Sequence, residues 1–194
     1  MSTPTAVRRP RRSSAETREH VLDTASRLFY GDGITATGVD RIAREAGVAP
    51  TTLYRLFASK DDLVTAYVEH GAAGYRDVVR TVTATGTPRE RILALFDATV
   101  AMVQSADCRG CPFLMALAEY PDPQSPVHRA AVAVKQWVRE HLRHLVAELD
   151  PAPRSPERLA ARLALVLEGV YGTVAAAGPV TEARPLVETL LDAA

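Results

Sequence analysis

The 194-residue chain is long enough for one or two compact domains, and its 47% hydrophobic and 24% charged residues indicate a globular rather than a disordered protein. It contains no run of about 18 apolar residues and no apolar N-terminal signal segment, so we expect a cytoplasmic protein without a membrane span. Its two cysteines, Cys108 and Cys111, exclude a framework of disulfide bonds.

The net charge of zero conceals an uneven distribution along the chain. Residues 1–60 contain ten arginines and lysines against six acidic residues, whereas residues 61–194 contain thirteen against seventeen. Four of those arginines lie within residues 1–13, a stretch rich in Pro, Ser and Thr that we expect to be a disordered basic arm. Such an arm either aids solubility or reaches DNA phosphates or a minor groove, and the sequence leaves both possibilities open.

Helix signals recur along the chain while strand signals are nearly absent, so we predict an all-α fold of about nine helices. The first spans about 14–30 and ends at Gly31-Asp32-Gly33. Two short helices follow within residues 37–60, joined by a tight turn at Gly47, where glycine adopts the left-handed conformation at little cost. We expect Thr37, with Asp40 three residues later, to cap the earlier helix. Pro50 suits the first position of the later one.

The remaining helices are predicted at about 60–82, 88–104, 112–120, 126–149, 156–177 and 181–192. Ser59 with Asp62 marks the start of the fourth, and Thr87-Pro88-Arg89-Glu90 marks the start of the fifth with a capping-box pattern. This order predicts a three-helix, helix-turn-helix domain at 14–60 and a regulatory domain at 61–194. The fourth helix, from about residue 60, links the two.

The outward face of the helix after Gly47 has the character of a DNA-recognition helix. Leu53 and Phe57 lie one turn apart and are predicted to face inward. Thr51, Thr52, Tyr54 and Arg55 remain on the outside. Hydroxyls, a tyrosine and an arginine on one face of a short helix suit insertion into a major groove.

Residues 15–60 resemble the DNA-binding domain of the tetracycline-repressor (TetR) family of bacterial transcriptional regulators. The resemblance is carried by Arg27-Leu-Phe-Tyr30, Gly33-Ile-Thr-Ala-Thr37, Val39-Asp-Arg-Ile-Ala43, Ala46-Gly-Val48, Thr52-Leu-Tyr-Arg-Leu-Phe57 and Ser59-Lys-Asp-Asp-Leu63. It implies a repressor that leaves a palindromic operator when a small apolar or amphipathic effector binds. It also implies a homodimer.

The family pattern further implies individual DNA contacts. Thr37 and Lys60 are expected to bind backbone phosphate, as is Tyr54, and Thr52 and Arg55 are expected on or beside the DNA. The chain departs from the pattern at Ala49, where a serine is frequent, and at Gly38, where a threonine is usual. Base recognition is therefore expected to depend on Thr51, Thr52 and Arg55.

The resemblance also implies a ligand pocket enclosed by the fourth to seventh helices. The candidate lining combines apolar side chains with two histidines, a composition typical of small-molecule sites, although each residue alone equally suits plain core packing. The candidates are Phe96, Met102, Phe113, Leu114, Met115, Leu117, Trp137, His141 and His144.

The last two helices carry more apolar surface than burial on one side requires, and the family pairs these helices across a two-fold axis. We therefore predict a homodimer interface formed by Leu163, Val166, Leu167, Val170, Tyr171, Val174, Leu186 and Leu190.

Other chemistry has weaker signals. A Cys108-x-x-Cys111 motif without a second ligand pair is a poor zinc site, so no metal and no cofactor is expected, but a thiol switch through these cysteines stays open as an alternative. No nucleophile elbow, phosphate loop or HExxH motif occurs, so we expect no enzyme. A DNA-binding protein without an effector is a second alternative.

Overall fold

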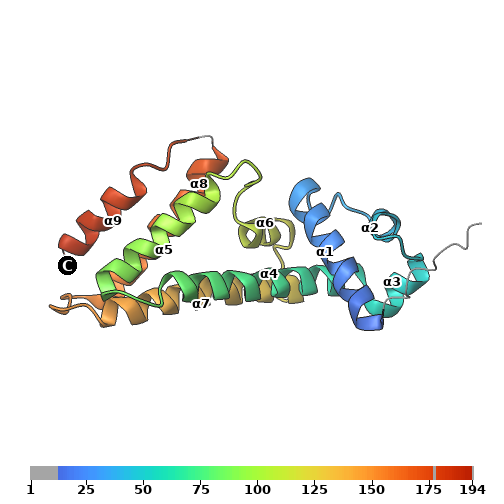
Figure 1. The fold of residues 1–194 in the computed structure, drawn as a ribbon, viewed down its shortest axis with the longest axis horizontal. Coiled ribbons are helices and arrows are strands. Elements are labelled where there is room, and N and C mark those ends of the chain that lie inside the picture. The colour runs from blue at the N-terminus through green and yellow to red at the C-terminus, as the bar shows by residue number, and fades with distance from the viewer. Residues whose placement is uncertain (1–12, 177, 194) are drawn as a thin grey trace, which may run out of the picture. The chain divides into compact units, whose positions relative to one another are not determined.

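The computed structural model describes residues 13–176 and 178–193, and all regular structure within them is helical (Figure 1). The helices are α1 (Ser14–Asp32), α2 (Val39–Glu45), α3 (Pro50–Leu56), α4 (Lys60–Val82), α5 (Pro88–Val103), α6 (Pro112–Glu119), α7 (Pro126–Ala147), α8 (Pro156–Ala175) and α9 (Ala183–Asp192). The predicted all-α fold class is confirmed. Within the described ranges, no helix is long and apolar enough to cross a membrane.

The chain divides into two compact units after Leu63, so the boundary falls inside α4. The first unit contains α1, α2, α3 and the beginning of α4, and the second contains the rest of α4 and α5 to α9. The predicted basic arm, residues 1–13, falls outside the described residues except for Ser13.

Local sequence signals explain where several helices begin. Ser13 caps α1 in a reciprocal capping box with Glu16, and Thr87 does the same for α5 with Glu90. The backbone N–H of Asp62 donates to the Ser59 hydroxyl at 3.0 Å, which secures the start of α4. The predicted starts of α4 and α5 are thus confirmed. Helix α9 begins two residues later than predicted, because 181–182 form a turn.

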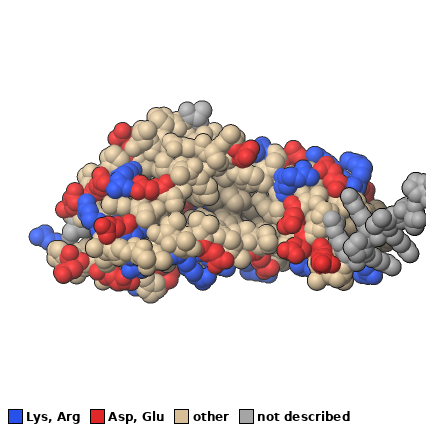
Figure 2. Space-filling view, viewed as in Figure 1, with Lys and Arg blue, Asp and Glu red and all other residues tan. Residues whose placement is uncertain are grey.

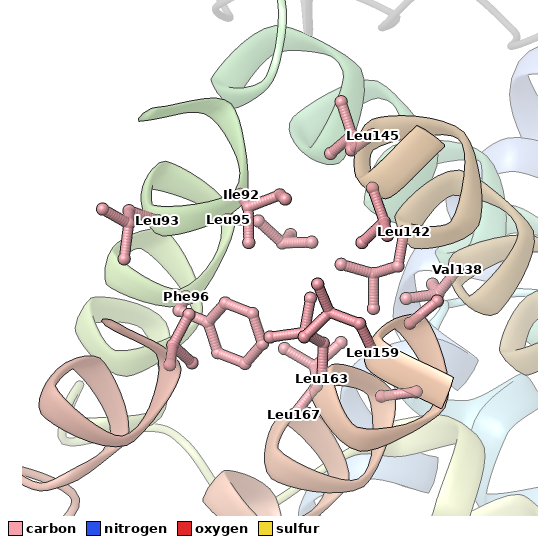
Figure 3. Packing of buried hydrophobic residues seen from close by; sticks show 14 of the residues in the cluster. Ile92, Leu93, Leu95, Phe96, Val138, Leu142, Leu145, Leu159, Leu163 and Leu167 are labelled. Carbon is pink, nitrogen blue, oxygen red and sulfur yellow. The ribbon is translucent and has the colours of Figure 1, made fainter. Parts of the chain in front are cut away.

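The core of the second unit is a continuous apolar cluster drawn from α5, α7, α8 and α9, with Val79 of α4 (Figure 3). Phe96 of α5 is fully buried, and its ring points toward the leucines of α8. The predicted seam of α7 is also buried, from Val127 to Leu145. Because the stripes of α7 and α8 meet in this cluster, the inward side of α8 is committed to the chain's own core.

Candidate nucleic-acid interface

The turn between α2 and α3 fixes the direction of the candidate recognition helix. Gly47 has φ of +66°, the left-handed conformation that glycine tolerates best. The backbone N–H of Val48 donates back to the Ala43 carbonyl at 3.0 Å, and Pro50 occupies the first turn of α3 as predicted. His20 of α1 lies against the same turn, with its Nε2 3.1 Å from the Ala46 carbonyl oxygen. Sequence reasoning did not anticipate this support from α1.

Helix α3 presents the predicted polar side chains to solvent. Leu53 is completely buried and Phe57 nearly so, which fixes the inward side of the helix. On the opposite side Thr51, Tyr54 and Arg55 are exposed, with Tyr54 retaining 51% of its surface. Thr52 is half-buried. The four residues predicted to face the DNA, three for base reading and Tyr54 for phosphate, therefore lie on the side of α3 opposite Leu53.

Thr37 does not occupy the predicted position. It is fully buried, and its hydroxyl donates to the Gly33 carbonyl at 2.7 Å, so it secures the turn after α1. The N-cap of α2 is Gly38, which makes no side-chain cap bond, so the assignment of Thr37 as a helix cap is wrong. A side chain without exposed surface cannot reach a phosphate, and we therefore drop Thr37 from the candidate DNA contacts.

Lys60 combines a structural bond with a free positive charge. Its Nζ donates to the Thr35 carbonyl at 3.2 Å, which ties the start of α4 to the loop before α2. A carbonyl does not neutralise the ammonium, and two of its three donors remain for other acceptors. Lys60 thus stays a candidate for phosphate binding.

The arginines of the first unit fall into two groups. Arg27 and Arg41 are paired with Glu45, and Arg41 also with Asp32. Hydrogen bonds from these two arginines lower the pKa of Glu45, so the cluster stays charged. By contrast, Arg18, Arg44 and Arg55 are exposed and have no ion pair within the described residues.

Basic and acidic side chains alternate over this unit on the face visible in Figure 2, with no continuous basic patch. Arg18 makes one special contact: its guanidinium carbon lies 4.7 Å from the centre of the Phe57 ring. The positive charges available for DNA binding are therefore single side chains, and each of them has different neighbours.

The predicted pocket residues differ in burial and in their neighbours. Phe96 lies in the core, and Trp137 packs against that core while stacking on His141 at 5.3 Å. His144 is exposed and pairs with Glu140, and Met102 and Leu114 retain about two-fifths of their surface. Phe113 is buried against Tyr75. Met115 and Leu117 are half-buried.

The second unit contains a polar cluster that the sequence did not reveal. The hydroxyls of Tyr75 and Tyr171 are hydrogen-bonded to each other, and burial raises the pKa of Tyr75 to about 12 and that of Tyr171 further. The ammonium of Lys135 lies over the Tyr171 ring and pairs with Glu168 at 2.8 Å. These groups come from α4, α7 and α8, so the cluster joins three helices inside one unit.

Part of the predicted dimer face of α8 is occupied by packing within the chain. Leu163, Leu167, Val170 and Tyr171 are buried within the chain, and Val166, Val174 and Leu190 are half-buried. Leu186 of α9 is exposed as predicted, but the most exposed large apolar side chain is Leu165, at 72%. The apolar stripe of α8 that seemed surplus is used by α5 and α7.

Leu165 separates two open hollows on this outer side. One, of about 510 Å³, lies between α7 and α8 and includes Arg139, Arg143 and Glu168. The other, of about 390 Å³, lies between α8 and α9 and includes Gly169 and Leu186. Neither contains a residue of the predicted effector pocket.

Neither cysteine forms a disulfide bond in the described structure. Cys111 is buried at the N-cap of α6 and Cys108 is half-buried, an arrangement that packing alone explains. Among residues 13–176 and 178–193, no three His, Cys, Asp or Glu side chains gather in a metal-binding group.

Comparison with known proteins assigns both parts of the chain. Residues 21–67 match the model "Bacterial regulatory proteins, tetR family", and residues 88–178 match "Tetracyclin repressor-like, C-terminal domain". The HTH-type transcriptional regulator BetI of Rhizobium meliloti is 32% identical over 159 residues, which span 79% of this chain and 75% of BetI.

Solved structures agree in fold. SCO4454, a TetR-family transcriptional regulator from Streptomyces coelicolor, superposes with a TM-score of 0.78 at 34% identity, covering 92% of each chain. A putative TetR-type regulator from Streptomyces avermitilis gives 0.83 at 30% identity, covering 92% of this chain and 97% of its own. The chain is therefore a helix-turn-helix transcriptional regulator, not an enzyme, and belongs to the TetR family.

Proposed function

We propose that the protein is a repressor that leaves a palindromic operator when a small apolar or amphipathic effector binds, and that it acts in the cytoplasm. The observation that carries the DNA-binding part is the outward face of α3. Thr51, Thr52, Tyr54 and Arg55 lie opposite the buried Leu53 on a helix fixed by the Gly47 turn. Such a helix enters a major groove with its outward side chains on base edges and phosphates.

The contacts divide by what they read. Tyr54 and Lys60 are proposed to bind phosphate, which positions the protein without reading sequence. Thr51, Thr52 and Arg55 are proposed to read base edges. Arg55→Ala should then cost about 1–3 kcal/mol on the preferred duplex and relax its preference at one position. Tyr54→Phe should weaken binding equally on preferred and scrambled duplexes. Equal losses on both duplexes for Arg55→Ala would remove its base-reading role.

The dimer is proposed to form through the outer side of α8 together with α9. Leu165 stands between the two hollows, with exposed Gly169 and Gly172 along the same side of the helix and exposed Leu186 on α9. Burying a leucine is worth about 1.5–3 kcal/mol, so a pair of Leu165 side chains is a substantial contribution. A two-fold dimer then presents two recognition helices to half-sites about one DNA turn apart.

Leu165→Glu tests this surface. We expect the wild type to sediment as a dimer at micromolar concentration and the variant as a monomer with unchanged helix content. Leu163→Ala is the control. Leu163 is buried in the chain's own core, so this substitution should mainly lower the free energy of unfolding of the protomer. A Leu165→Glu protein that remains dimeric would place the interface elsewhere.

Regulation is proposed to pass through α4, which belongs to both units. A ligand that shifts α4 between His70 and Val78 would change the presentation of α3. Ligand and DNA would then oppose each other with a coupling free energy of typically about 1–3 kcal/mol, equal in both directions. The comparisons lend no support to the thiol-switch or effector-free alternatives.

The decisive experiment is a screen of small molecules for release of the protein from its own upstream DNA, run with and without a thiol oxidant. Release by a ligand under reducing conditions supports the proposal. Release by the oxidant alone, lost in Cys108→Ser or Cys111→Ser, would replace the effector with a thiol switch.

A further inference from the structure

We propose that Arg18 of α1 is an additional phosphate-binding residue of the DNA interface, held in place by the ring of Phe57. The inference rests on the proposed DNA-binding function of α3. It adds a contact from a helix outside the helix-turn-helix pair, at a position to which the sequence patterns assigned no role.

The contact between Arg18 and Phe57 fixes where the charge lies. The guanidinium carbon is 4.7 Å from the ring centre, within the range of about 6 Å in which a cation is attracted to an aromatic face. Phe57 is 3% exposed, and its N–H donates to the Leu53 carbonyl at 2.9 Å, so the ring is immobilised at the end of α3. Figure 1 shows the N-terminal end of α1 beside α3.

The charge of Arg18 is not used inside the described structure. Arg18 is exposed and has no ion pair there, and its neighbour Glu16 is engaged in the capping box, accepting from the Ser13 N–H at 2.7 Å. A guanidinium that stacks on an aromatic face keeps the N–H donors at its edge, in a fork that matches a phosphate. Arg18 is therefore held in position while its donors remain available.

The position also places Arg18 near a second candidate phosphate contact. Arg18 contacts Phe57, the C-cap residue of α3, and Lys60 begins α4 three residues later in the sequence. Two cations that flank this short segment, one by contact and one by sequence, suit binding to the DNA backbone.

Arg27 provides a matched control on the same helix. It is also an exposed arginine, with 66% of its side-chain surface free, but it is paired with Glu45 at 2.9 Å. We compare Arg18→Gln and Arg27→Gln on two duplexes, one selected by the wild type from a random pool and one scrambled. Binding is measured over a series of salt concentrations.

For Arg18→Gln we expect the same fold-loss of affinity on both duplexes and a salt slope lower by about one unit, since one phosphate contact releases about 0.9 counterion. Arg27→Gln should leave the slope unchanged. Phe57→Leu should lower affinity in the same uniform way, because it removes the ring that holds Arg18. The thermal unfolding midpoints of the two arginine variants should match that of the wild type. A loss of DNA affinity can then be assigned to a lost contact and not to unfolding.

Two outcomes would overturn the inference: an unchanged slope for Arg18→Gln, or a loss confined to the selected duplex, which would signify base reading. A wild-type protein that binds neither duplex would overturn the proposed function itself.

Discussion

The two units use their positive charges differently. In the second unit several ion pairs join helices: Arg91 of α5 pairs with Glu148 at the end of α7, Lys135 of α7 with Glu168 of α8, and Arg184 of α9 with Asp97 of α5. In the first unit, three of the six described basic residues have no acidic partner and a fourth binds a carbonyl. Substitution of a residue in one of these helix-joining pairs should therefore lower stability, whereas substitution of an arginine without an acidic partner in the first unit should lower DNA affinity.

The largest effect is expected from the apolar core of the second unit. Phe96→Ala removes a fully buried ring and should lower the free energy of unfolding by about 3–5 kcal/mol. Urea denaturation followed by circular dichroism measures the loss. At urea concentrations below the unfolding midpoint of the variant, binding to a scrambled duplex should persist, because the first unit has its own core. A loss under 1 kcal/mol would show that the cluster collapses readily around the missing ring.

A smaller effect should follow from the ion pair between α7 and α8. The Lys135 side chain is only 12% exposed, so Lys135→Met leaves Glu168 without its partner and should cost about 1–3 kcal/mol. Arg143→Met is the matched control on α7, because its pair with Glu140 lies on the surface, where solvent screens the attraction, and its loss should change stability little. Equal losses in the two variants would contradict the structural role assigned to Lys135. DNA affinity should stay unchanged in both.

A pH-dependent effect is expected at His141. Its Nε2 lies 2.9 Å from the Thr83 hydroxyl, which itself donates to the Val79 carbonyl, so the ring nitrogen is assigned as the donor. Desolvation first, then the charges of Arg91, His144 and Arg80, lower the pKa of His141, while the charge of Glu148 opposes them.

Because the unfolded chain binds this proton more readily, His141 reduces stability progressively as pH falls below about 6.5. The stability of the wild type relative to His141→Gln should therefore decline between pH 7 and pH 5. The measurement is urea unfolding at several pH values, and a pH-independent difference would refute the assignment.

Local signals were predictable from sequence, whereas the choice of a helix's inward side was not. Thr87 and Glu90 cap α5 as expected, since both partners lie within one turn. Thr37 had the same local pattern, but carbonyls at the end of α1 attract its hydroxyl instead. Helix α8 is apolar on several sides, and only packing against α5 and α7 decides that Leu163 faces inward and Leu165 outward.

The local pairing of charges in the first unit has a kinetic consequence. Between residues 13 and 63 the sequence has six basic and eight acidic residues, so this part creates no long-range attraction for DNA. This part of the protein should then associate with DNA at about 10⁵–10⁶ M⁻¹s⁻¹, the rate without electrostatic steering. The arginines that precede residue 13 are not included in this charge count. Arg18 and Lys60 act only after contact, and their loss should appear mainly as faster dissociation, with the rate of arrival little changed.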